Sequence, residues 1–152
     1  MTFPKTDDWL QLDQQLCFAL YSTSLAMTKI YKPILGELGL TYPQYLVMLV
    51  LWEHGKVTVS ELGGRLRLDS GTLTPLLKRL ESAALVRRER DADDERRVLI
   101  SLTDTGRELR SAAVGIPEKL LCAVQCSVEE IQALTVRLHD LRSTLEEARS
   151  ED

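Results

Sequence analysis

The sequence predicts a mainly α-helical fold with one β-hairpin, and three observations point to it. Apolar residues recur every three or four positions near both ends of the chain, as in long amphipathic helices. Two short helical segments joined by a turn lie in the middle, and a pair of strand-like runs follows them. With 152 residues and 44% hydrophobic content, the chain is expected to fold as a single domain over 1–152 without disulfide or metal support.

The first predicted helix begins at Trp9 and runs to about Ile34, because apolar side chains repeat there at helical spacing. Pro33 is expected to kink or end this helix, since proline removes a backbone hydrogen bond. A short helical piece should follow, and Gly39 is a suitable residue to stop it.

The next predicted helix spans Tyr42 to His54, with Thr41 as its N-cap. It is apolar on nearly all sides, so most of its surface should be buried. Beyond it, Thr58 and Glu61 have the spacing of a capping box, which predicts a short helix from there to about Leu66.

A tight turn after Leu66 leads into another helix, expected over about 70–84. Two short helices joined in this way form a helix-turn-helix, a motif whose second helix reads DNA. Pro75 is hard to place, because it would remove a helical hydrogen bond about five residues after a Ser70 cap. The start of this helix is therefore left open between Ser70 and Thr72.

Two strand-like runs, 85–90 and 97–102, flank an acidic loop and predict a β-hairpin. A hairpin directly after a helix-turn-helix is a wing. The sequence therefore predicts a winged helix-turn-helix over 41–103, with the wing at 85–102.

The chain after the wing is expected to be helical. Thr103 should cap a helix that runs to about Val124 with a kink at Pro117, and a capping box should open a last helix. One face of that last helix is apolar: Val128, Ile131, Leu134, Leu138, Leu141 and Leu145. Both ends of the chain thus offer apolar faces beyond the needs of a small winged helix, and 9–40 and 104–150 are expected to form a two-fold dimerisation region.

Charge and cysteine content narrow the function classes. The net charge is −4, yet residues 65–97 hold nine Lys and Arg against seven Asp and Glu, or +2, which leaves −6 on the rest of the chain. No run of about eighteen apolar residues and no signal-peptide pattern is present, so a soluble, cytoplasmic protein without membrane association is expected. Three cysteines in such a chain do not predict a structural disulfide framework.

Several segments of the sequence carry a family resemblance. The stretches 68–81, 94–96 and 99–106 closely resemble the MarR family of winged-helix regulators, and the match extends over nearly the whole chain. Within that family, 15–21, 27–33 and 40–45 are similar to the OhrR group of organic hydroperoxide sensors, because they combine a cysteine with tyrosines. The resemblance implies a homodimeric transcriptional repressor without a cofactor.

The resemblance also implies a DNA-binding surface. The second helix of the motif would enter the major groove of operator DNA, and the wing arginine Arg96, braced by Asp94, would reach the minor groove. An ordinary solvated surface is the alternative. The implied contact residues are Asp69, Ser70, Thr72, Thr74, Pro75, Lys78, Arg79, Arg88, Arg90, Asp94 and Arg96.

Cys17 is the candidate sensor. It shares a helix face with Tyr21, but most cysteines in such a position are inert. The resemblance implies that Tyr31 and Tyr42 of the partner subunit hydrogen-bond the Cys17 thiolate, with an organic hydroperoxide as inducer. An apolar lining for that hydroperoxide is expected from Phe18, Met27 and Leu46.

A second thiol would trap the oxidised Cys17 as a disulfide. By resemblance the expected resolving residue is Cys122 of the partner subunit, and Cys126 is the alternative. These two cysteines are also four residues apart, but neither His54 nor His139 has ligand spacing from them, so no metal site is expected.

Two other functions compete with a redox-controlled repressor. One is a MarR-type repressor released by a small phenolic or apolar ligand. The other is a thiol peroxidase, which is disfavoured because no catalytic base is evident beside Cys17 and the helix-turn-helix would have no role. The protein is therefore not expected to be an enzyme.

Overall fold

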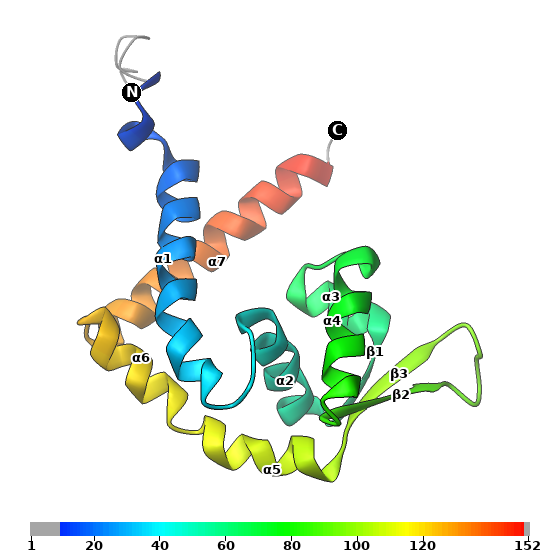
Figure 1. Ribbon diagram of the computed structural model, residues 1–152. Coiled ribbons are helices and arrows are strands. Elements are labelled where there is room, and N and C mark those ends of the chain that lie inside the picture. The colour runs from blue at the N-terminus through cyan, green and yellow to red at the C-terminus, as the bar shows by residue number, and fades with distance from the viewer. Residues whose placement is uncertain (1–9, 151–152) are drawn as a thin grey trace. The chain divides into compact units, whose positions relative to one another are not determined.

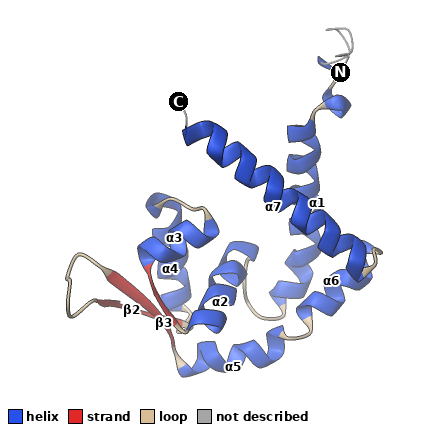
Figure 2. Cartoon of the chain, turned by 180° about the vertical axis from the view of Figure 1, so that it is seen from behind, coloured by secondary structure: helices blue, strands red, loops and turns tan. Residues whose placement is uncertain are grey.

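The computed structural model describes residues 10–150, which are mostly helical with one small sheet (Figures 1 and 2). The predicted mainly α-helical winged helix-turn-helix is confirmed. The chain divides into two compact units, one ending at Val114 and the other beginning at Gly115. Trp9, the predicted start of the first helix, lies outside the described residues.

In the described part of the first unit, a short 3-10 helix, η2 (Leu12–Gln14), precedes α1 (Leu16–Gly36). α1 starts later than predicted, because Gln15 has an extended backbone with φ −85° and ψ 116°. Pro33 does not end α1, which continues to Gly36. The stop near Gly39 is confirmed: this glycine adopts a φ of +66°, and the turn is closed by a hydrogen bond from the Leu40 N–H to the Leu35 carbonyl.

α2 (Tyr42–His54) has its predicted bounds. The Gln44 N–H donates to Thr41 Oγ1 at 3.4 Å, and the Thr41 N–H donates to Gln44 Oε1 at 2.9 Å, which is a complete capping box. The predicted burial is also confirmed for the residues that form the centre of the core: Tyr45, Val47, Met48 and Leu51.

The helix-turn-helix consists of α3 (Val59–Leu66) and α4 (Ser70–Ser82). The capping box of Thr58 and Glu61 opens α3 as predicted. A short strand, β1 (Lys56–Thr58), precedes α3 and was not predicted. It is only three residues long, so no alternating pattern could reveal it.

α4 begins at Ser70, which settles the boundary that the sequence left open. Pro75 lies inside the helix, although it cannot donate a backbone hydrogen bond. Burial of one complete face compensates for that loss, since four leucines of α4 are at most 9% exposed: Leu73, Leu76, Leu77 and Leu80.

The predicted hairpin is formed by β2 (Val86–Arg90) and β3 (Val98–Leu102). Together with β1 these strands make an antiparallel sheet in the order β1-β3-β2. Ile100 sits at the centre of the sheet, opposite Val57 on one side and Arg88 on the other, and it is fully buried. Beyond this sheet the loop of the hairpin extends away from α2, α3 and α4 (Figure 1).

α5 (Asp104–Ala113) is fastened to the base of the hairpin. The Thr103 hydroxyl donates to the Ala84 carbonyl at 2.6 Å, and the Thr103 N–H donates to the Leu85 carbonyl at 3.1 Å. Gly106 lies so close to Leu85, the residue before β2, that an added Cβ would be 2.1 Å from the Leu85 carbonyl oxygen. Only glycine fits here.

The second unit contains α6 (Ile116–Val124) and α7 (Val128–Ser150). The prediction of one helix to Val124 kinked at Pro117 is wrong, because the helix breaks earlier, between Ala113 and Ile116. Pro117 lies in the first turn of α6, where its missing N–H costs little. The predicted capping box at the start of α7 is present.

Large apolar side chains remain exposed on α1 and α7, several of them from the predicted stripes. They are Leu16, Leu20, Tyr21 and Leu25 on α1, and Val128, Leu134, Val136, Leu138 and Leu145 on α7. Neither face is covered within its own unit. Among residues 10–150, no helix combines the length and the apolar character that crossing a bilayer requires.

Candidate functional site

The outer face of α4 is polar and exposed. The buried leucines fix the rotation of the helix, so the predicted DNA-contacting residues between them point outward. Thr74 is half-buried, and the exposed members of the set are Asp69, Ser70, Thr72, Pro75, Lys78 and Arg79. The structure thus brings the predicted contact residues of α4 to its outer face.

Asp69 organises the beginning of this surface. Its Oδ1 accepts a hydrogen bond from the Thr72 N–H at 2.8 Å, and the Thr72 hydroxyl donates to Oδ2 at 3.2 Å. These bonds, the backbone one first, hold the pKa of the Asp69 carboxyl below its ordinary value. Asp69 therefore acts as the N-cap of α4, whereas Ser70, the cap considered from the sequence, is the first residue of the helix.

The hairpin loop carries an arginine whose guanidinium is hydrogen-bonded to a neighbouring carboxylate. Arg96 donates through Nε to Asp94 Oδ1 at 3.1 Å and through Nη2 to Oδ2 at 3.3 Å. The hydrogen bond from the Arg96 side chain is the main reason that the pKa of Asp94 is lowered. Since the Arg96 side chain is 91% exposed, the carboxylate fixes the direction of a guanidinium that projects into solvent.

The other two predicted arginines of the hairpin lie on β2. Arg88 Nε donates to Glu81 Oε2 at 2.8 Å, which ties the strand to the last turn of α4. Arg90 is exposed at the end of β2, opposite Val98.

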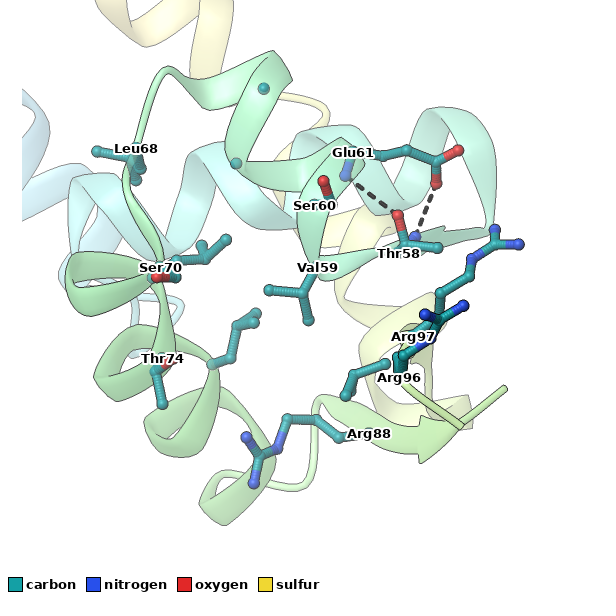
Figure 3. A pocket seen from close by; sticks show the side chains of 15 residues that line it. Thr58, Val59, Ser60, Glu61, Leu68, Ser70, Thr74, Arg88, Arg96 and Arg97 are labelled. Atoms are coloured by element: carbon teal, nitrogen blue, oxygen red, sulfur yellow. Dashed lines mark hydrogen bonds between the residues drawn. The ribbon is translucent and has the colours of Figure 1, made fainter. Parts of the chain in front are cut away.

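A cavity of about 800 Å³ opens between α3, α4 and the hairpin (Figure 3). Hydroxyl groups border it from the two helices and guanidinium groups border it from the hairpin. The polar lining residues are Thr58, Ser60, Glu61, Ser70, Thr74, Arg88, Arg96 and Arg97. The rest of the lining is glycine or apolar: Val59, Gly63, Gly64, Leu68, Leu73, Leu77 and Val98. Ser60 and Arg97 were not among the residues predicted from the sequence.

Cys17, the predicted sensor, is the second residue of α1, and it is exposed in the single chain. Tyr21, one turn later, is 62% exposed. Both residues therefore lie on a surface of α1 that the rest of the first unit leaves uncovered.

Tyr31 and Tyr42 form a close pair where α1 meets α2. Their ring centroids are 4.7 Å apart, and the ring of Tyr45 lies 6.0 Å from that of Tyr31. Burial, together with the neighbouring rings of Tyr42 and Tyr45, raises the pKa of Tyr31 to about 12, so this hydroxyl stays protonated. Tyr45 was missed as a member of the cluster, although its spacing of three from Tyr42 on a helix is a usable signal.

Within one chain, Cys17 cannot meet these rings. Cys17 and Tyr31 are fourteen residues apart on the same helix, which is about 21 Å at 1.5 Å per residue. If the tyrosines act on the thiol, they must come from a second chain.

An apolar cavity of about 500 Å³ lies beside Tyr42, with Leu25, Leu40 and Pro43 in its wall and two lysines, Lys29 and Lys32, at its border. The residues predicted to line a hydroperoxide pocket do not border this cavity. Phe18, Met27 and Leu46 are each half-buried elsewhere in the first unit.

The two remaining cysteines belong to the second unit and are exposed. Cys122 is in the last turn of α6, but Cys126 follows the end of that helix, where Gln125 has a left-handed backbone with φ 56°. The two cysteines, although four residues apart in sequence, therefore do not lie on one helix. In the range 10–150, no group of three or more metal-ligating side chains is assembled.

The fold and the polar face of α4 define a winged helix-turn-helix protein of the DNA-binding class. Residues 29–112 match the model of the SarA/Rot family of transcriptional regulators. The chain is 51% identical to the organic hydroperoxide resistance transcriptional regulator of Bacillus subtilis over 138 residues, which covers 91% of this chain and 94% of the relative.

Solved structures of one related regulator, AbfR of Staphylococcus epidermidis, agree with this match. Reduced AbfR bound to DNA is 36% identical with a TM-score of 0.75, covering 92% of this chain and 97% of AbfR. Overoxidised AbfR bound to DNA is 37% identical with a TM-score of 0.74, covering 91% of this chain and 98% of AbfR. Disulfide-formed AbfR is 36% identical with a TM-score of 0.60, covering 93% of this chain and 94% of AbfR. The chain belongs to the MarR-type winged-helix transcriptional regulators, in the group of organic hydroperoxide resistance regulators.

Proposed function

We propose that the chain is a redox-sensing repressor that binds operator DNA as a reduced homodimer and is released when an organic hydroperoxide oxidises Cys17. The observation that carries this proposal is the 51% identity, over 91% of the chain, with an organic hydroperoxide resistance regulator. The exposed polar face of α4 supports the DNA-binding part, and the exposed thiol of Cys17 supports the sensing part.

In the reduced dimer, α4 enters the major groove and Arg96 reaches the adjacent minor groove. The uncovered apolar faces of α1 and α7 pack against those of a second chain, so that residues up to 40 and from 104 onward form the dimer interface. A two-fold dimer with its α4 helices about 34 Å apart matches successive major grooves of an inverted repeat.

Oxidation starts at the Cys17 thiolate, which attacks the terminal oxygen of the hydroperoxide. The O–O bond breaks, the organic part leaves as an alcohol after taking up a proton, and Cys17 becomes a sulfenic acid. The hydroxyls of Tyr31 and Tyr42 of the partner subunit hold the thiolate, since one chain cannot bring them together.

A disulfide then completes the response. The thiol of Cys122 of the partner subunit attacks the sulfenic sulfur, an S–S bond forms and water leaves. Drawing Cys17 toward Cys122 displaces the tyrosine pair at the α1–α2 junction, and the rigid-body shift that follows spoils the spacing of the two α4 helices. AbfR has been solved on DNA in its overoxidised form, which favours the disulfide as the releasing event.

The test is a gel shift with DNA from upstream of the protein's own gene, before and after one equivalent of cumene hydroperoxide and again after dithiothreitol. We expect binding, then release, then recovery, while Cys17→Ser stays bound throughout. Release of Cys17→Ser by peroxide would contradict the proposal. Binding that ignores peroxide but is lost with a phenolic ligand would favour the ligand-controlled repressor instead.

A further inference from the structure

We propose that the cavity between α3, α4 and the hairpin holds one strand of the operator's phosphodiester backbone, with Arg97 and Ser60 as its additional contacts. This inference rests on the proposed binding of operator DNA and deepens it. It adds two residues that neither the helix-turn-helix pattern nor the wing motif identifies.

The position of the cavity is the first argument. One wall is formed by Ser70 and Thr74 of α4, and the opposite wall by Arg96 and Arg97 at the hairpin (Figure 3). A helix in the major groove and a wing in the neighbouring minor groove are always separated by one sugar-phosphate strand. That strand has to pass through the space between α4 and the hairpin, and the cavity of about 800 Å³ is that space.

The chemistry of the walls is the second argument. Phosphate oxygens carry no sequence information and are bound by guanidinium groups and hydroxyls. The cavity offers both kinds of donor, and its lining includes three arginines and one carboxylate, Glu61. The backbone N–H of Thr58 already binds that carboxylate at 2.8 Å, so Glu61 serves the cap of α3. Each arginine also has a carboxylate partner outside the lining, namely Glu81, Asp94 or Asp91.

The geometry of Arg97 is the third argument. Its Nη1 lies 3.6 Å from Asp91 Oδ2, and its side chain is 53% exposed. One carboxylate occupies at most two of the five donors of a guanidinium, so Arg97 is oriented by Asp91 and keeps donors for a phosphate. Ser60, in the first turn of α3, is an exposed residue at the border of the same cavity, next to Thr58 and Glu61 (Figure 3).

The salt dependence of operator affinity tests this assignment. The logarithm of the binding constant falls with the logarithm of the salt concentration, and each phosphate contact contributes about −0.9 to that slope. Arg97→Gln removes two contacts per dimer, so its slope should be less negative by about 1.8. Affinity for operator and for unrelated DNA should fall by the same factor, since no base is read. Arg97→Lys should retain the slope.

Arg107→Gln is the matched control, because Arg107 is an exposed arginine of α5 paired with Asp104 at 2.9 Å and does not border the cavity. Its slope should equal that of the unchanged protein. Ser60→Ala, an exposed substitution with little risk to folding, should weaken binding a few-fold at every salt concentration without changing the slope.

An unchanged slope for Arg97→Gln, or a loss confined to the operator sequence, would overturn the inference while the repressor proposal stands. Failure of the unchanged protein to bind its upstream DNA would instead remove the repressor proposal itself. Full affinity of Ser60→Ala would exclude that hydroxyl as a contact.

Discussion

Trp52 on α2 donates its indole N–H to the backbone carbonyl of Gly106 on α5, at 2.9 Å, across 54 residues of sequence. The ring of Trp52 also packs edge-on against Tyr45, with centroids 6.4 Å apart. Gly106 in turn lies against the Leu85 carbonyl at the base of the hairpin. This one bond therefore connects the tyrosine cluster with the point where the hairpin leaves the core.

Trp52→Phe should lower the free energy of unfolding by about 1–3 kcal/mol, because the hydrogen bond is lost, the Gly106 carbonyl is left without that donor, and the smaller ring fills less space. Urea unfolding at fixed protein concentration measures the change. The control is Leu49→Ala on the same helix, where the side chain is 41% exposed and a smaller effect is expected. Equal stabilities of Trp52→Phe and the unchanged protein would mean that the bond contributes nothing.

Gly106→Ala should be among the most destabilising single changes, by about 2–4 kcal/mol, since its Cβ would lie 2.1 Å from the Leu85 carbonyl oxygen. That oxygen is backbone and already accepts from Thr103, so it cannot move aside freely. Gly64→Ala is the matched change, because nothing lies within 4 Å of its added Cβ, and an alanine inside α3 should stabilise by up to about 1 kcal/mol. Thermal unfolding should separate the two in opposite directions.

Asp69→Asn tests the charge of the α4 cap. Asparagine keeps an acceptor for the Thr72 N–H, so the two proteins differ mainly in charge. The pKa of Asp69 is lowered by folding, and its charge therefore stabilises the fold above the ordinary value of 3.8 and loses this effect as the pH falls through the folded value. The difference in Tm between the two proteins should be constant near pH 7 and shrink below about pH 4. Asp69→Ala removes the acceptor as well and should be less stable at every pH.

Cys122→Ser distinguishes the two candidate resolving thiols. After peroxide, the Cys126→Ser protein should run as a covalent dimer on a non-reducing gel and leave the DNA, whereas Cys122→Ser should remain monomeric on that gel and stay bound. The opposite pattern would assign the role to Cys126. Release of Cys122→Ser without any crosslink would make the sulfenic acid itself the signal.

Local features of the fold could be predicted from the sequence. The N-cap at Thr41 and the capping box of Thr58 and Glu61 each involve residues only three apart, and both are formed as expected. The bond from the Thr41 N–H to the Gln44 side chain, which completes a second capping box, was not predicted. Both predicted features depend on interactions within one or two turns of helix, which a sequence pattern contains in full.

Features that depend on distant residues could not be predicted. β1 exists because Lys56 to Thr58 pair with β3, more than forty residues later. Pro75 is accepted inside α4 because the hydrophobic core holds the helix on both sides of it. Arg97 and Ser60 line one cavity only after α3 and the hairpin are placed, and no spacing in the sequence indicates that they share it.

Because Cys17 and Tyr31 lie far apart along α1, variant chains can complement each other in a mixed dimer, and sensing depends on protein concentration. Each reactive centre of the proposed dimer is assembled from two chains, so a chain defective in its thiol and a chain defective in its tyrosines can complement each other. A mixed dimer of Cys17→Ser and Tyr31→Phe chains would contain one intact centre and one doubly defective centre. At concentrations too low for pairing, peroxide sensitivity and operator recognition would disappear together.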